Sequence, residues 1–116
     1  MSSMKIVERQ VGDVTVLDLQ GALRSGESDD QLRDAVSRLL ASGKRKILVN
    51  LAAVPYMDSA GLGEVVRCYA TVSRTGGVMK LVNLTAKIRD LLTITKLLTV
   101  FETYDSEELG VRSFQS

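Results

Sequence analysis

The sequence contains no histidine and no tryptophan, and it has one proline and one cysteine. Histidine is the commonest general base, the commonest metal ligand and the usual activator of a nucleophilic serine, so its absence argues against many enzyme classes. The lone Cys68 cannot form an internal disulfide, and its apolar neighbours favour a reduced intracellular protein in which it is a small core residue. We therefore expect a protein that is not an enzyme and that has no metal site.

An excess of charge of one sign is also missing, as are long apolar runs. Lys and Arg outnumber Asp and Glu by only one, so no global charge attracts the chain to nucleic acid or an anionic membrane. No segment is apolar enough to span a bilayer, and the N-terminus lacks the apolar segment of a signal peptide. We expect a cytoplasmic protein, and the basic run at 44–46 is better explained as a solvated turn than as a nucleic-acid contact.

What the chain does contain is the composition of an ordinary globular domain. Its 116 residues are 45% hydrophobic and 25% charged, a balance that supports a core without excess apolar surface. This length is near the usual size of one domain, and no linker or internal repeat divides it. We interpret residues 1–116 as a single domain.

Strand and helix patterns alternate along the sequence. Apolar and β-branched runs predict strands at 5–10, 14–20, 47–51, 78–84 and 100–104. Helical spacing or capping residues predict helices that begin at a capping box formed by Ser28 and Gln31, near Leu62, after Thr85 and at Ser106. The order ββαβαβαβα predicts an α/β fold, a mixed and mostly parallel sheet of about five strands with four helices, in which the first strand runs antiparallel.

The loop after the third strand is the main candidate for a site, because sites in open α/β sheets lie beyond the carboxyl ends of the strands. This candidate loop consists of Met57, Asp58, Ser59, Ala60, Gly61, Leu62 and Gly63. Asp58 and Ser59 both suit a helix N-terminus, and capping alone would explain the pair. Alternatively, Ser59 accepts a phosphate, which would meet free N–H groups and the positive end of the helix dipole.

Two glycines in the first turns of the following helix also need an explanation, because glycine there costs about 1 kcal/mol relative to alanine. Gly61 and Gly63 either leave a flat surface around Ser59 for a partner or permit close packing of the helix on the sheet.

Nucleotide-binding motifs are not supported, since the third glycine of a dinucleotide fingerprint and the lysine of a P-loop are both absent. A serine hydrolase would need a general base and a Gly-x-Ser-x-Gly turn, whereas this chain has no histidine and its Ser59 follows Met57 and Asp58.

These segments resemble the STAS domain family, and within it the bacterial anti-sigma factor antagonists, also called anti-anti-sigma factors. The similarity covers almost the whole chain and includes Gly21-x-Leu23, the strand at 49–51, the loop at 57–63 and the glycine pair at 76–77. The resemblance implies that Ser59 is phosphorylated by an anti-sigma factor that is itself a serine kinase, and dephosphorylated by a PP2C-type phosphatase. Unphosphorylated protein would bind the kinase and free the sigma factor. It also implies no cofactor, and a monomer or weak homodimer.

Two positions depart from the family pattern. Many relatives carry an acidic residue at the position of Arg24 and a glycine at the position of Lys96. Arg24 either lies near Ser59 and belongs to the partner-binding surface, together with the candidate loop, or is an ordinary solvent-exposed residue. A second class of STAS domain also fits the sequence, a constitutive scaffold or transport-accessory domain in which Ser59 only caps its helix.

Overall fold

The computed structural model describes residues 4–115, and its elements follow the predicted order. The strands are β1 (Lys5–Val11), β2 (Val14–Gln20), β3 (Lys46–Ala53), β4 (Val78–Val82) and β5 (Thr103–Tyr104). The helices are α1 (Glu27–Ala41), α2 (Ser59–Arg74), α3 (Ala86–Ile94) and α4 (Glu107–Arg112). The α/β class and the ββαβαβαβα order are confirmed.

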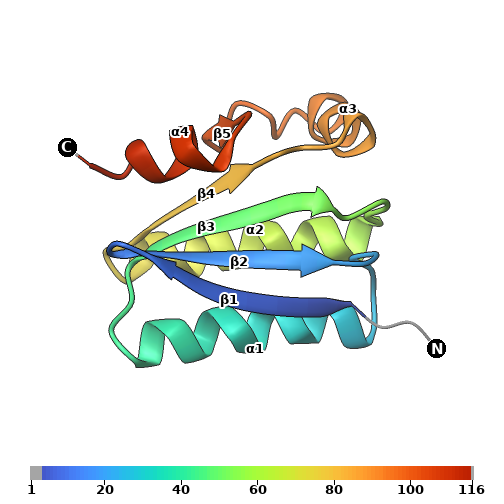
Figure 1. Cartoon of the computed structure of the whole chain (residues 1–116). Coiled ribbons are helices and arrows are strands. Elements are labelled where there is room, and N and C mark those ends of the chain that lie inside the picture. Colours follow the sequence, from blue (N-terminus) through green and yellow to red (C-terminus); the bar gives the residue numbers. More distant parts are fainter. Residues whose placement is uncertain (1–3, 116) are drawn as a thin grey trace.

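The strands form one twisted sheet in the order β1-β2-β3-β4-β5 (Figure 1). β1 pairs with β2 as an antiparallel hairpin, and each later strand pairs in parallel with its predecessor. Because the parallel strands are joined through helices, their carboxyl ends meet at one edge of the sheet. The loop from β3 to α2 starts from this edge.

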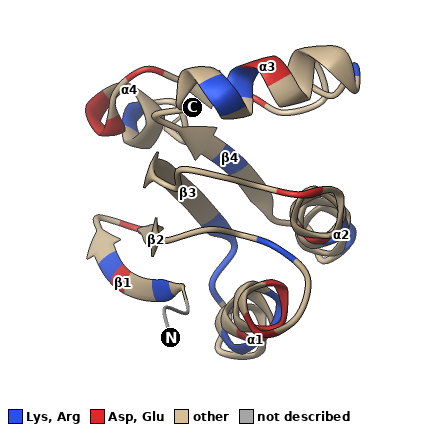
Figure 2. Ribbon diagram, turned by 90° about the vertical axis from the view of Figure 1, so that its right-hand side faces the viewer, with Lys and Arg blue, Asp and Glu red and all other residues tan. Residues whose placement is uncertain are grey.

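Alternation along the central strands divides the apolar side chains between two faces of the sheet. The larger core lies under α1 and α2, where Leu17, Val49 and Leu81 form one buried cluster with apolar residues of both helices. On the opposite face, α4 and the following Phe114 cover a smaller cluster that includes Val16 and Leu48. Figure 2 shows the consequence, with α1 and α2 together on one side of the sheet and α4 on the other.

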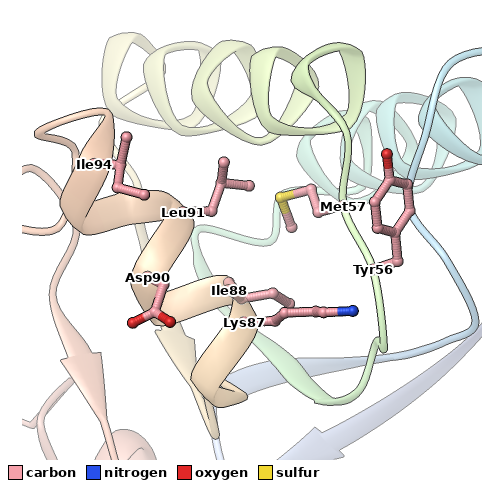
Figure 3. A pocket seen from close by; sticks show the side chains of 7 residues that line it. All are labelled: Tyr56, Met57, Lys87, Ile88, Asp90, Leu91 and Ile94. Carbon is pink, nitrogen blue, oxygen red and sulfur yellow. The ribbon is translucent and has the colours of Figure 1, made fainter.

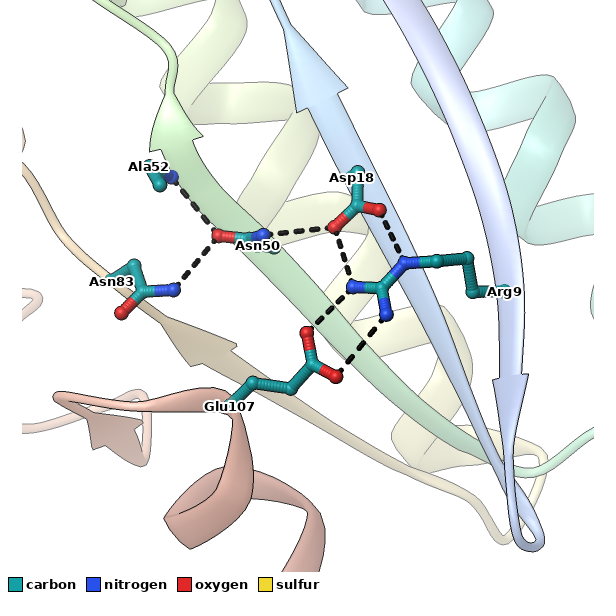
Figure 4. A network of polar contacts seen from close by, with 6 residues as sticks. All are labelled: Arg9, Asp18, Asn50, Ala52, Asn83 and Glu107. Carbon is teal, nitrogen blue, oxygen red and sulfur yellow. Dashed lines mark hydrogen bonds and ion pairs between the residues drawn. The ribbon is translucent and has the colours of Figure 1, made fainter.

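A polar network joins the sheet to α4 on its less covered face (Figure 4). Arg9 of β1 donates to Asp18 of β2 at 2.6 and 3.0 Å and to Glu107 of α4 at 2.6 and 3.2 Å. Asn50 of β3 donates to Asp18 at 2.8 Å and accepts a hydrogen bond from Asn83 at 3.2 Å. This network holds the start of α4 against the first two strands.

Several predicted element ends are wrong. β4 stops at Val82 rather than at Leu84, because Asn83 turns the chain with a φ of 61°. Ser28 does not cap the first helix, which begins earlier, after Gly26, and has no side-chain cap. Gly26 adopts a φ of 103°, which turns the chain into the helix directly, and the Ser28 hydroxyl instead bonds to the backbone N–H and C=O of Arg24. The last strand is limited to Thr103–Tyr104, because Val100 and Phe101 lie in the turn before it and Phe101 packs edge-on against Tyr69.

Candidate functional site

The candidate loop is held by a second loop, which joins β2 to α1. Leu23 forms an isolated parallel bridge with Met57, and its N–H donates to the Tyr56 carbonyl at 3.0 Å. The Asp58 N–H in turn donates to the Leu23 carbonyl at 3.2 Å. The two loops are therefore fixed to one another by backbone hydrogen bonds just before α2 begins.

Asp58 is the residue that caps α2. Its backbone is extended, and its carboxylate accepts hydrogen bonds from the N–H groups of Gly61 at 2.8 Å and Ser25 at 3.2 Å. The hydrogen bond from Gly61 is the main cause that lowers the pKa of Asp58, with smaller contributions from the N–H groups of Ser25 and Ala60 and from the positive charge of Arg24. Asp58 is consequently an ionised carboxylate beside Ser59.

Ser59 is the first residue of α2 and is exposed. Because Asp58 occupies the capping position, Ser59 is not needed as a cap. Among the described residues, its hydroxyl makes no hydrogen bond that would hold it in place. The cap interpretation therefore applies to Asp58, and the Ser59 side chain is exposed to solvent.

The two glycines have different environments. A Cβ on Gly61 would lie 2.2 Å from the Leu23 carbonyl oxygen, so the close packing of the loop at Leu23 on α2 requires glycine. The atoms nearest to a Cβ on Gly63 would be those of the Arg67 guanidinium, at 3.6 Å or more, which is ordinary contact. Close packing therefore explains Gly61 and not Gly63, which lies on a partly exposed side of the helix.

The other predicted site residues differ in accessibility. Arg24 is exposed and near enough to Asp58 for its charge to act on that carboxylate, while Ala60 is partly exposed. Met57, Gly61 and Leu62 are buried and shape the site from beneath. The accessible part of the predicted site is thus formed by Arg24 and Ser59, with Asp58, Ala60 and Gly63 partly exposed.

The sequence analysis did not identify a charged cluster one turn further along α2. Glu64 is only 1% exposed, and its Oε1 accepts hydrogen bonds from Arg67 at 3.1 Å and from Arg33 of α1 at 3.4 Å. Its Oε2 accepts a weak one from Cys68 at 3.5 Å. Burial, followed by the charge of Glu64, raises the pKa of the Cys68 thiol to about 12, so this cysteine is not a reactive thiolate. The sequence held one indication of this cluster, because helical spacing places Glu64 among apolar residues that face the core.

A cavity of about 290 Å³ lies on the other side of the candidate loop, between Tyr56 and Met57 on one wall and α3 on the other (Figure 3). Its lining is mostly apolar, and Ile94 at the end of α3 is 77% exposed. Lys87 and Asp90 supply the charged groups at its rim. This cavity is thus shared between the residues that precede Asp58 and helix α3.

Within residues 4–115, no cluster of three or more His, Cys, Asp or Glu side chains is arranged to hold a metal ion. No helix in the same range has the length and hydrophobicity needed to cross a bilayer.

Comparison with known proteins identifies the family. The model of the STAS domain matches residues 5–110, so the chain belongs to the STAS domain family. It is 36% identical over 73 residues to the anti-sigma-B factor antagonist of Bacillus subtilis (strain 168), an alignment that covers 63% of this chain and 67% of that protein.

Solved structures show the same fold over nearly the full length. The crystal structure of the protein tm1081 from Thermotoga maritima has a TM-score of 0.88 and 26% identity, and covers 96% of this chain and 95% of that one. The Bacillus cell fate determinant SpoIIAA in its phosphorylated form has a TM-score of 0.74 and 21% identity, covering 97% and 100%. At that identity, the second likeness shows the fold alone.

Proposed function

We propose that this chain is an anti-sigma factor antagonist controlled by phosphorylation. In its unphosphorylated form it binds an anti-sigma factor that is a serine kinase, and the sigma factor is freed to direct transcription. Phosphate on Ser59 releases the kinase, and a PP2C-type phosphatase restores the binding form. In this proposal the protein is a regulatory binding module of the cytoplasm, without a catalytic centre of its own.

The observation that carries the proposal is the division of roles between Asp58 and Ser59. Asp58 caps α2 through Gly61, while the exposed Ser59 hydroxyl is left without a structural bond to any described residue. Such a serine is accessible to a kinase, and its modification would not remove an interaction that holds the fold. The match to an anti-sigma-B factor antagonist over most of the chain supports the same partner class.

Phosphorylation would act on binding through charge. A phosphate adds about two negative charges at neutral pH, and Ser59 already follows the ionised Asp58. In a contact from which water is excluded, this concentration of negative charge would cost several kcal/mol if the partner does not neutralise it. The fold itself would tolerate the phosphate, because the Ser59 side chain is exposed at the positive end of the α2 dipole and its hydroxyl bonds no described residue.

The first test is to map the site of modification. With the cognate kinase and ATP, we expect mass spectrometry to find phosphate on Ser59 in the natural protein and none in Ser59→Ala. Ser25→Ala is the matched control, because Ser25 is also exposed and lies beside Asp58. Undiminished phosphorylation of Ser59→Ala would refute the assignment, whereas its loss in both variants would point to a general effect on kinase docking.

The second test separates the switch from a constitutive scaffold. Calorimetry with the purified kinase should show tight binding by Ser59→Ala and much weaker binding by Ser59→Asp, with both variants folded. Equal affinities of the two variants would contradict control by charge. They would favour the scaffold or transport-accessory alternative.

A further inference from the structure

The surface of α2 carries a cation that is placed to meet a phosphate on Ser59. Arg67 lies two turns after Ser59 on the same side of the helix, with Gly63 between them. The guanidinium of Arg67 folds back over Gly63, with Nη1 3.6 Å and Nη2 3.9 Å from the position that a Cβ on Gly63 would occupy. Helical side chains lean toward the N-terminus, which explains this direction.

The geometry brings the guanidinium close to the phosphorylation site. On a helix, the Cβ positions of residues four apart are about 5 to 6 Å from one another, so Ser59 and the empty position above Gly63 are neighbours. A phosphate extends beyond the Ser59 Cβ by one C–O and two P–O bonds, a reach similar to the spacing of Cβ positions one turn apart. Because Gly63 has no side chain, that residue puts nothing between such a phosphate and the Arg67 guanidinium.

Arg67 is also free to change partners. It is 63% exposed and donates to Glu64 at 3.1 Å, but Glu64 has a second cation, Arg33 of α1, at 3.4 Å. If Arg67 turned toward a phosphate, the buried carboxylate of Glu64 would keep Arg33 and the contact from Cys68. An ion pair with two alternative guanidinium groups can lose one of them without leaving a buried charge alone.

We propose that Arg67 is the phosphate-binding residue of this switch, exchanging Glu64 for phospho-Ser59 when the chain is modified. The inference rests on the proposed function, since it assigns a role to a residue near the same serine. Guanidinium and phosphate form strong charge-assisted hydrogen bonds, and arginine presents a planar donor pair that fits a phosphate. The exchange would stabilise the dianionic phosphate and shield it from the phosphatase.

The test measures the second ionisation of the phosphate by ³¹P NMR. Phosphoserine is incorporated at position 59 during synthesis of the full chain, so no kinase is needed and failure of the kinase assay cannot affect the result. A nearby cation favours the dianion and lowers the phosphate pKa, so Arg67→Gln should raise that pKa by about 0.5 unit, the shift expected of an exposed ion pair. The difference should shrink as salt is added.

Three further variants make the outcome specific. Arg74→Gln removes an arginine from the last turn of the same helix and should leave the phosphate pKa unchanged. Arg24→Gln measures the contribution of the other candidate cation. Glu64→Gln removes the competing carboxylate and should lower the phosphate pKa, which keeps the proposal testable if Arg67→Gln fails to fold. The assignment would be overturned if the phosphate had the same pKa in the natural protein and in Arg67→Gln. It would also be overturned if Glu64→Gln did not change the phosphate pKa.

Discussion

The packing of α2 against the loop that follows β2 depends on the absence of a side chain at Gly61. The Leu23 carbonyl oxygen that approaches Gly61 also accepts a hydrogen bond from the Asp58 N–H at 3.2 Å. Any side chain at Gly61 would push this carbonyl away and disturb the capping turn as well. The sequence identified both glycines as unusual in a helix, but Leu23 is remote in the chain, so only the structure distinguishes their roles.

Gly61→Ala should therefore destabilise the protein. Its Cβ would lie 2.2 Å from backbone oxygen, which cannot move as a flexible side chain does, and overpacking of this kind typically costs about 1 to 3 kcal/mol. Gly63→Ala is the matched control, because its Cβ finds ordinary contacts and should gain about 1 kcal/mol from helix propensity. Urea unfolding of both variants gives the comparison, and equal effects would contradict the packing account.

Arg24 is exposed near Asp58, at a position where the sequence analysis expects many relatives to carry an acidic residue. The structure brings its charge within range of Asp58, although no ion pair joins the two among the described contacts. Arg24→Asp should speed dephosphorylation of Ser59 by the phosphatase and reduce any thermal stabilisation on phosphorylation, since an acid there repels the phosphate. The measurement is the rate of phosphate release. Rates equal to those of the natural protein would make Arg24 an ordinary exposed residue.

At the scale of elements, the long periodic segments and the helix starts with local capping residues were predictable, whereas other ends were not. Thr85 caps α3 as expected, through a 3.3 Å bond from the Ile88 N–H, because this motif is local in the sequence. The start of α1 was missed because Gly26 at positive φ serves as an entry that the capping pattern does not describe. The charged contacts of Glu64 were missed for another reason, since Arg33 comes from a different helix.

The end of α3 offers a prediction about the partner-binding surface. Ile94 is largely exposed and lines the same cavity as Tyr56 and Met57, where the candidate loop begins. If the anti-sigma factor covers this surface, Ile94→Ser should weaken binding several-fold by removing apolar burial, and should barely change stability. Calorimetry and thermal melts measure the two effects. The exposed Val78, at the opposite end of β4, is the control, and Val78→Ser should leave binding unchanged.

At the scale of the whole molecule, the two sides of the sheet are stabilised differently. The side covered by α1 and α2 is closed by a large apolar core, whereas α4 is held over the other side by a small cluster and by the network around Arg9. The periodic apolar pattern predicted the strands and helices that form the first side. It could not predict the network, because Arg9, Asp18 and Glu107 come from three elements and meet only in the folded chain.

This network makes the stability of the protein depend on pH. The hydrogen bond from Arg9 is the main cause that lowers the pKa of Asp18 in the folded state, and Asn50 adds to it. A carboxyl group whose pKa is lower when folded stabilises the protein above its unfolded pKa, and that contribution is lost as the pH falls through the folded value. Asp18→Asn should therefore lower the free energy of unfolding by about 1 to 2 kcal/mol at neutral pH, given that the pair is partly exposed.

Asp18→Asn and the natural protein should differ less in their free energy of unfolding as the pH falls from about 4, the unfolded pKa of aspartate. The reason is that protonation removes the same charge from the natural chain. Urea unfolding across this pH range measures it. Asp13→Asn is the control, since Asp13 also pairs with a cation, Lys46, but on the open surface where water screens the pair. If the free energies of unfolding of Asp18→Asn and the natural protein differed by the same amount at every pH, the charge of Asp18 would not be what holds α4 on the sheet.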